Sequence, residues 1–192
     1  MATVREGQQT ALVVVDVQVG VVADAWEAPR VIQNVARAVD RARAQGVPVV
    51  WVQHHDHNLA QGSAAWQWVP ELVPALGEPL IHKQFNSGFE QTALEAELAA
   101  RGVAHIVLAG AATNWCIRAT AYAALERGYD LTLVKDAHTT ETMVMDDGTR
   151  IEAAQVVQDL NIGMTWLSYP GRRNATAAAE TLDFAALGNA PR

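Results

Sequence analysis

Three side chains that together could attack a carbonyl group stand at or just after the ends of predicted strands. Asp16 closes an apolar run, Lys83 follows a short strand, and Cys116 lies at the start of a predicted helix. A thiolate is the reactive form of cysteine, and a helix N-terminus or a nearby ammonium group lowers the pKa of a thiol. A carboxylate within reach takes the thiol proton and later delivers it to a leaving amine. Each residue alone is more often a turn residue, a solvated lysine or a small buried side chain, so their shared position decides the interpretation.

The stretch that leads into the cysteine suits a reaction at a carbonyl carbon. Residues 110–116 read Gly-Ala-Ala-Thr-Asn-Trp-Cys and join a predicted strand to the helix. Backbone N–H groups at such a turn can hold a developing oxyanion. The small residues of this turn let a substrate carbonyl approach closely. The sequence therefore predicts a nucleophile beside a backbone anion site.

Apolar strands and amphipathic helices alternate along the chain, and this order positions the three side chains. Strands are predicted at 12–15, 47–52, 79–82, 105–109, 131–134 and 164–167, and helices at 29–45, 92–101, 115–127 and 151–160. Thr92 and Glu95 form a capping box at the second of these helices. The alternation predicts an α/β fold with three α/β/α layers and a doubly wound, mostly parallel sheet. Ligands of such sheets bind outside the carboxyl ends of the strands, so Asp16, Lys83 and Cys116 share one rim.

Two segments depart from this alternation. Residues 54–78 contain Trp66 and Trp68 and show little periodicity, which is typical of a binding loop or lid, or of an ordered surface loop. The alanine-rich end after Gly171 is interpreted as a helix against a neighbouring subunit or as a frayed tail. We expect one domain over residues 1–192.

The composition excludes several classes of protein. The chain has 192 residues, one cysteine, 14 basic and 21 acidic residues, and a formal charge of −7. One cysteine rules out an intrachain disulfide framework and a thiolate zinc cluster. An acidic chain without a basic run is a poor nucleic-acid binder, and no apolar run approaches the roughly 18 residues of a membrane span. The polar residues 1–10 lack the order of a signal peptide, so we expect a cytoplasmic protein without nucleic-acid or membrane partners.

Several motifs in register resemble a known superfamily. The first is Val-Val-Asp-Val-Gln at 14–18, and the second is His-Lys at 82–83, followed by residues Phe85 to Phe89. The third is the stretch 110–121, in which a glycine, a threonine and the cysteine follow one another at intervals of three residues. With these motifs the chain resembles the isochorismatase-like cysteine hydrolases over residues 10–168. This superfamily includes nicotinamidases, N-carbamoylsarcosine amidases, ureidoacrylate amidohydrolases and isochorismatases.

The resemblance implies a role for each residue of the trio. Cys116 would be the nucleophile, Asp16 the general acid and base, and Lys83 the group that holds the thiolate. It also implies a cis peptide between Ala111 and Ala112, with the N–H groups of Ala112 and Cys116 as an oxyanion hole. The expected enzyme is an amidohydrolase-like hydrolase that cleaves a C–N bond of a small molecule through a thioester.

Two other functions compete with this one. Isochorismatases cleave a vinyl ether and need no cysteine at the nucleophile position, so Cys116 favours the amidase branch. A non-catalytic member would serve as a binding or assembly module, which has no need of the intact trio. The resemblance further implies a homo-oligomer, a dimer or a tetramer.

The residues that could hold a metal or line the pocket are less defined. Nicotinamidases place Asp-x-His and a further His after the second strand, whereas residues 54–57 here read His-His-Asp-His, out of that register. Such ligands can bind a divalent ion, yet a polar loop start is the preferred interpretation, and we expect no metal and no cofactor. Aromatic and polar side chains near the three strand ends are the candidates for the substrate pocket: Gln18, His55, Trp66, Phe85 and Trp115.

Overall fold

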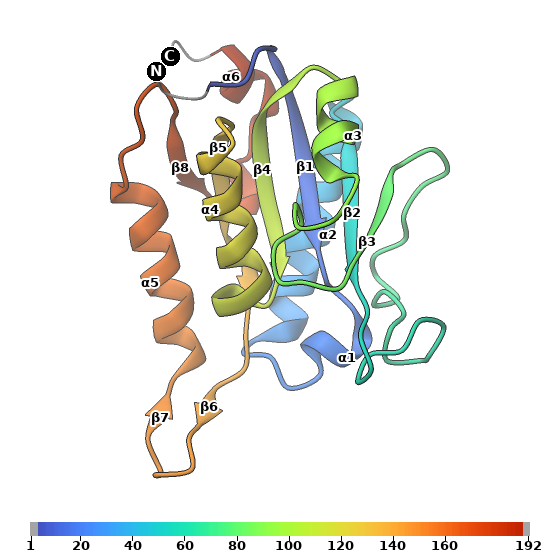
Figure 1. Cartoon of the computed structure of the whole chain (residues 1–192), viewed down its shortest axis with the longest axis vertical. Helices are drawn as coiled ribbons and strands as arrows, with labels where there is room; N and C mark the ends of the chain where they lie inside the picture. The colour runs from blue at the N-terminus through green and yellow to red at the C-terminus, as the bar shows by residue number, and fades with distance from the viewer. Residues whose placement is uncertain (1–3, 190–192) are drawn as a thin grey trace.

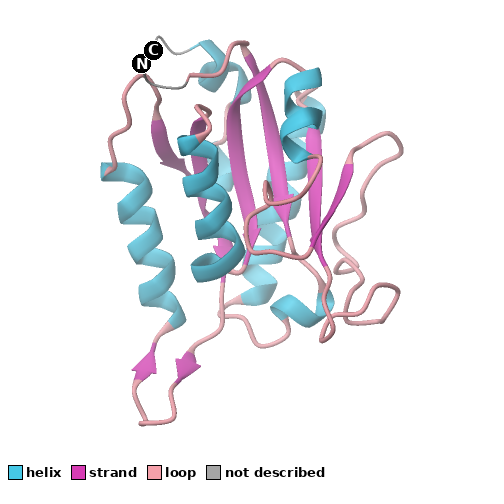
Figure 2. Ribbon diagram, viewed as in Figure 1, coloured by secondary structure: helices cyan, strands magenta, loops and turns pink. Residues whose placement is uncertain are grey.

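The strands are apolar along most of their length because helices cover both faces of the sheet they form. The computed structural model describes residues 4–189 (Figures 1 and 2). All strand pairs of the six-stranded sheet are parallel, in the order β3-β2-β1-β4-β5-β8. The strands are β1 (Gln9–Val15), β2 (Val49–His54), β3 (Leu80–Lys83), β4 (Val103–Ala111), β5 (Asp130–Thr139) and β8 (Asn174–Ala177). The three-layer, doubly wound α/β/α fold is therefore confirmed.

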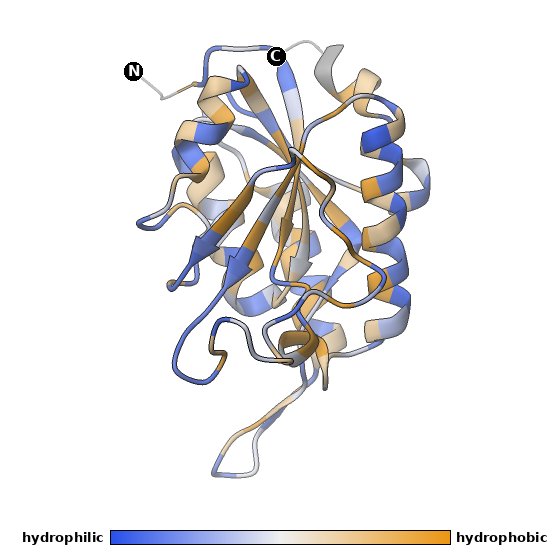
Figure 3. Cartoon of the chain, turned by 90° about the vertical axis from the view of Figure 1, so that its right-hand side faces the viewer, coloured by the Kyte–Doolittle hydropathy of each residue, from blue (hydrophilic) through white to orange (hydrophobic). Residues whose placement is uncertain are grey.

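Side chains alternate between two cores, one on each face of the sheet. Val13 of β1 points into the core beneath α3 (Leu94–Ala100), α4 (Arg118–Glu126) and α5 (Ala153–Trp166). Its neighbour Val14 points into the core beneath α2 (Ala28–Ala44) and α6 (Phe184–Asn189). Figure 3 shows hydrophobic residues along the strands and mixed hydropathy along the helices. The period-2 alternation of a strand explains why each strand serves both cores.

The strand order reverses next to β1, and this places the functional rim. From β1 the chain moves outward to β2 and β3, then crosses back to β4 on the other side of β1. The carboxyl ends of β1 and β4 therefore lie side by side at the reversal, which is where open α/β sheets bind ligands. The short helix α1 (Val19–Val22) begins directly beyond this rim.

The structure differs from the predicted elements at three places. The helix expected over 92–101 is present as Leu94–Ala100, but the predicted capping box is not formed: the Thr92 hydroxyl donates to Gly88 O at 2.5 Å and accepts from Leu94 N at 3.2 Å. Residues 164–167 are not a strand, since Met164 lies on the inner face of α5 and is buried. Through residue 189 the segment after Gly171 is not a frayed tail, because it supplies the edge strand β8 and buries Phe184. The alternative of a helix against a neighbouring subunit stays a prediction, and residues 190–192 lie outside the described residues.

Two further features lie outside the layers. Residues 55–79 form the irregular connection seen beside β3 in Figure 1, and Trp68 anchors it against Trp51 with ring centroids 5.0 Å apart. The antiparallel pair β6 (Met143–Val144) and β7 (Arg150–Ile151) forms a projecting hairpin. Within residues 4–189, none of the helices combines the length and apolar character needed to span a bilayer.

Candidate active site

Asp16, Lys83 and Cys116 meet at the rim of the sheet. Lys83 Nζ lies 2.7 Å from Asp16 Oδ2 and 3.2 Å from Cys116 Sγ. Asp16 and Lys83 are almost fully buried, whereas Cys116 is partly exposed to the cavity. The structure thus brings together the three residues that the sequence singled out, from the ends of β1 and β3 and from the turn after β4.

The close approach of β4 to the end of β1 sets this geometry. Gly110 has φ +133°, and a Cβ atom there would lie 2.0 Å from Val15 O, so only glycine fits. Asp16 directly follows Val15 and adopts a left-handed φ of +52°, which turns it out of the strand direction. The backbone at this point therefore aims the carboxylate at the chain that leads to Cys116.

Cys116 lies on a π-helical turn over Thr113–Ile117 rather than on the first turn of an α-helix. Ile117 N donates to Ala112 O at 3.1 Å, which is the five-residue spacing of a π-turn, and α4 begins only at Arg118. Such turns are frequent at functional sites. The Ala111–Ala112 peptide bond, just before this turn, is cis.

A buried hydrogen-bond chain supports the π-turn from β5. Asn161 Nδ2 donates to Lys135 O, so its Oδ1 accepts from His138 Nε2 at 3.0 Å. His138 Nδ1 is then the acceptor for the Thr113 hydroxyl, 2.9 Å away. Burial lowers the pKa of His138 to about 4, which keeps the ring neutral at physiological pH. His138 lies inside β5, whose carboxyl end extends to Thr139, further than the strand predicted over 131–134.

Burial and charge determine which member of the trio holds the proton. Burial raises the pKa of the Cys116 thiol to about 12, and the Asp16 carboxylate acts in the same direction. Burial also raises the pKa of Asp16, against the opposing charge of Lys83. Although burial alone would lower it, the pKa of Lys83 is raised by Asp16 and Cys116. The expected lowering of the thiol pKa is therefore wrong for the resting site, because desolvation and the carboxylate outweigh the ammonium group.

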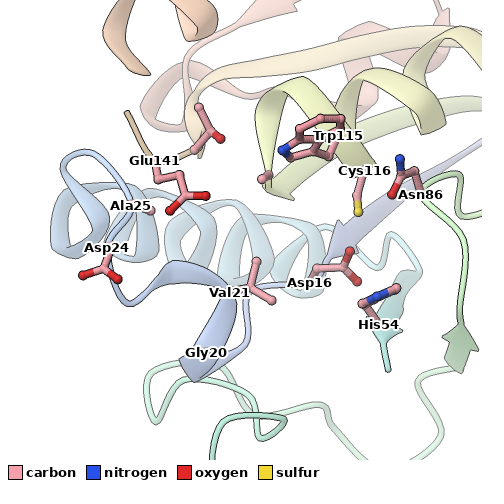
Figure 4. Close-up of a pocket in the computed structure, with 12 residues that line it drawn as sticks. Asp16, Gly20, Val21, Asp24, Ala25, His54, Asn86, Trp115, Cys116 and Glu141 are labelled. Atoms are coloured by element: carbon pink, nitrogen blue, oxygen red, sulfur yellow. The ribbon is translucent and has the colours of Figure 1, made fainter. Parts of the chain in front are cut away.

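A cavity of about 300 Å³ opens beside the trio. Asp16 and Cys116 lie on one side of it in Figure 4, and Trp115, a residue that is 51% exposed, forms part of the wall. The lining also includes His54, considered above only as a metal ligand, and residues that sequence reasoning missed: Gly20, Val21, Asp24, Ala25, Asn86, Thr140 and Glu141. Glu141 could have been found by its place two residues beyond a strand end, had the carboxyl end of β5 been recognised.

Of the five residues predicted for the pocket, Trp115 lines it and the other four do not. Gln18 is fully buried, and its amide bonds the backbone of His54 and Trp66. The Trp66 ring stacks on His82 with centroids 5.7 Å apart. Gln18 and Trp66 therefore hold the irregular segment beneath the cavity.

His55 and Phe85 also lie away from the cavity lining. The His55 ring meets the edge of His82, 6.3 Å between centroids, on the side of β3. Phe85 is 47% exposed. These side chains follow strand ends, but the chain turns them outward from the cavity.

The histidine-rich stretch after β2 forms ion and hydrogen-bond contacts of its own. His54 Nε2 lies 3.2 Å from Asp56 Oδ2, and its Nδ1 lies 3.4 Å from Lys83 Nζ. His54 thus extends the trio by one polar contact. Within residues 4–189, no group of three or more histidine, cysteine, aspartate or glutamate side chains is arranged to hold a metal ion.

Comparison with known proteins matches most of the chain. Residues 10–164 match the isochorismatase domain family. An isochorismatase from Pseudomonas putida KT2440 is similar at 25% identity and a TM-score of 0.81, over 95% of this chain and 94% of that one. A protein of the isochorismatase family from Chromobacterium violaceum ATCC 12472 is 28% identical, with a TM-score of 0.79, over 99% of this chain and 100% of its own. A cysteine hydrolase from Pseudomonas syringae pv. phaseolicola 1448A shares the fold at 21% identity and a TM-score of 0.79, over 94% of each chain.

Proposed function

This chain belongs to the isochorismatase family as one of its hydrolases, and on that premise we propose that it cleaves a C–N amide-like bond of a small molecule through a thioester on Cys116. The observation that carries the proposal is the position of Lys83 Nζ, 2.7 Å from the Asp16 carboxylate and 3.2 Å from the Cys116 sulfur, beside a cavity of about 300 Å³. A cavity of this volume is at the lower end of the range for small-molecule sites.

In the first half of the reaction, the carbon–nitrogen bond breaks. Asp16 takes the Sγ proton while the sulfur bonds to the carbonyl carbon, and the carbonyl electrons move to its oxygen. The N–H groups of Ala112 and Cys116 stabilise that oxyanion. The oxyanion collapses, Asp16 delivers the proton to the nitrogen, and ammonia or an amine leaves behind a thioester.

In the second half, water releases the acid. Asp16 takes a proton from a water molecule while the oxygen of that water attacks the thioester carbon. The carbon–sulfur bond then breaks and the sulfur recovers the proton from Asp16. The net reaction converts an amide and water into a carboxylic acid and ammonia or an amine. Asp16, Lys83 and Cys116 return to the charges that they had at the start.

Throughout the cycle Lys83 acts as a fixed charge. Its ammonium group balances Asp16 at rest and the developing thiolate when Asp16 becomes protonated. A buried charge left without a partner is strongly destabilising. Transfer of the proton between Cys116 and Asp16 is favourable because one of the two is always anionic beside Lys83.

The proposal is tested on a panel of small amides, ureas and carbamoyl compounds. We expect the wild-type chain to hydrolyse a member of the panel, and Cys116→Ala to lower its rate by about 10³-fold or more. Mass spectrometry of the acid-quenched wild-type protein with that substrate should show the acyl group on Cys116, the only thiol in the sequence. Unchanged hydrolysis by Cys116→Ala would exclude covalent catalysis by the thiol.

The same panel separates the competing functions. A vinyl ether cleaved equally well by wild type and Cys116→Ala would indicate isochorismatase-type chemistry. Tight binding without turnover of any compound would indicate a binding module. The intact and buried pair of Asp16 and Lys83 argues against the latter, because buried ion pairs seldom improve stability over apolar side chains.

A further inference from the structure

Two carboxylates stand at the cavity without a partner. Asp24, between α1 and α2, and Glu141, just beyond β5, both line the cavity that contains Cys116. Both are exposed, and neither side chain takes part in an ion pair or hydrogen bond within residues 4–189. In Figure 4 they lie toward the same side of the pocket, across from Asp16 and Cys116. We name Asp24 and Glu141 the acidic end of the cavity.

No cation in the lining offsets this charge. Neither lysine nor arginine occurs among the residues around the cavity. The ammonium group of Lys83 is already paired with Asp16, and the ring of His54, which lines the cavity, lies between Lys83 and Asp56. The cavity therefore has a negative potential at the acidic end, which attracts cations and repels carboxylates and phosphates.

The wall of the cavity between the acidic end and Cys116 suits a short organic chain. Trp115 and Val21 lie between the acidic end and the nucleophile in Figure 4. The half-exposed indole offers a π-face, which attracts cationic groups, and the valine offers an apolar surface. A molecule with its carbonyl at Cys116 would cross this wall before it reached the carboxylates.

We propose that the substrate is a small amide whose other end carries a cationic amine, bound by Asp24 and Glu141 while its carbonyl lies at Cys116. This assignment rests on the proposed amide hydrolysis for its reaction. The recognition of the cation depends only on the charges of the cavity, so it can be measured with or without turnover.

The first test measures the potential at the nucleophile through its rate of disulfide formation. The thiolate of Cys116 attacks a methanethiosulfonate, forms a disulfide and releases methanesulfinate. The probes are the 2-(trimethylammonium)ethyl and 2-sulfonatoethyl reagents, each normalised to its rate with free 2-mercaptoethanol. We expect the normalised cation-to-anion ratio to exceed 10 at low salt and to fall about 3- to 10-fold in Asp24→Asn or Glu141→Gln, because each variant removes one nearby charge.

Glu71→Gln is the matched control, because Glu71 is an exposed carboxylate outside the cavity lining. It should leave the ratio unchanged, whereas 0.5 M salt should reduce the ratio in the wild-type chain. A ratio equal to that of the free thiol, or one that Asp24→Asn and Glu141→Gln both leave unchanged, would overturn the inference whatever the protein hydrolyses.

The second test compares three amides of equal length: 4-aminobutanamide, neutral pentanamide and anionic glutaramate. Calorimetric binding to Cys116→Ala should favour the cationic amide by about 10-fold or more over the neutral one, and glutaramate should bind weakest. Equal binding, or a preference for glutaramate, would contradict the inference.

Turnover by the wild-type chain separates the two proposals. Tighter binding of the cationic amide without hydrolysis of any amide in the panel would support the cation site and remove the proposed reaction. Hydrolysis that prefers pentanamide would support the reaction and overturn the cation site. A double variant Asp24→Lys, Glu141→Lys should reverse the order of binding in favour of glutaramate.

Discussion

At the scale of single residues, the net charge of the trio explains where the proton lies. An Asp16 carboxylate, a Lys83 ammonium group and a Cys116 thiol sum to zero in a buried site, and ionising the thiol would leave an uncompensated negative charge. Burial, reinforced by the Asp16 carboxylate, therefore raises the pKa of the thiol to about 12. In the proposed mechanism Cys116 is activated in step with proton transfer to Asp16, and burial raises the pKa of that carboxyl above its ordinary value.

Asp16→Asn should separate thiol reactivity from hydrolysis. Removing the carboxylate leaves Lys83 without an anionic partner, so the thiolate becomes that partner and the pKa of Cys116 falls. We expect iodoacetamide to alkylate this variant about 10-fold faster than wild type at pH 7, while amide hydrolysis falls by about 10²-fold or more because the base is gone.

Asp159→Asn is the control, since Asp159 forms a surface ion pair with Arg118. It should change neither rate. Slower alkylation of Asp16→Asn would show that the carboxylate does not hold the thiol in its protonated form.

At the scale of secondary-structure elements, the turn after β4 is held from two sides. Gly110 lets β4 approach the end of β1, and the Thr113 hydroxyl bonds the ring of His138 on β5. The ring in turn bonds Asn161 on α5. Cys116 thus occupies a turn whose conformation depends on contacts with a neighbouring strand and a helix.

Gly110→Ala should destabilise the protein strongly. The added Cβ would lie 2.0 Å from Val15 O, a backbone atom inside the sheet that cannot move away. We expect a loss of more than about 3 kcal/mol in the free energy of unfolding, measured by urea denaturation. Gly62→Ala is the matched control, because Gly62 also has a positive φ, +83°, but nothing within 4 Å of the added atom. It should lose about 1 kcal/mol, and equal losses in the two variants would contradict the argument from close approach.

The buried His138 predicts an acid-sensitive fold. Its pKa falls from 6.5 when unfolded to about 4 when folded, so between these values the unfolded chain binds the extra proton. The free energy of unfolding should therefore decrease as the pH falls from 6.5 to 4, by about 3 kcal/mol from this group.

His138→Gln keeps a hydrogen-bonding side chain and removes the titration. Its stability should be lower at pH 7 and should vary less between pH 6.5 and 4, as followed by urea denaturation at several pH values. His57→Gln, at an exposed position, should keep the wild-type pH dependence. An unaltered slope in His138→Gln would show that another group accounts for the acid sensitivity.

At the scale of the whole molecule, the last segment completes the sheet and one core. β8 pairs with β5 along residues 131–134, and Arg173 forms an ion pair with Asp130 at 2.8 Å. Phe184 of α6 is buried with α2 on the same face. The chain end is therefore an integral part of the layered domain that positions the site at the opposite, carboxyl edge.

Phe184→Ala should lower the free energy of unfolding by about 3–5 kcal/mol, because it leaves a cavity in the core. Phe85→Ala, at a half-exposed position, should lower it by about 0.5 kcal/mol.

A chain that stops at Gly171 should not reach the native far-ultraviolet circular dichroism spectrum or a cooperative melting transition. A stable, cooperatively folding truncated chain would show that β8 and α6 are dispensable.

The sequence by itself determined the layered fold and the identity of the trio. Runs such as 12–15 are apolar at every position and rich in β-branched residues, which favours a strand covered on both faces, and the carboxyl ends of parallel strands meet at one edge. Residues that follow those ends, as Asp16 and Cys116 do, are therefore gathered by topology alone. Elements of mixed pattern were less predictable: Met164 fits a strand or a helix equally in isolation, and its contacts with the sheet decide for α5.

Only the tertiary structure decided what surrounds the trio. Asp24 and Glu141 are 117 residues apart in the chain, and no local pattern indicates that they line one cavity. Gln18 and Trp66 carry suitable side chains but use them to hold the segment beneath it. The direction of the Cys116 pKa shift likewise depends on desolvation, which is a property of everything packed around the sulfur rather than of its neighbours in sequence. Sequence periodicity reports which face of an element is buried, whereas the lining and the charge of a cavity arise from contacts between elements.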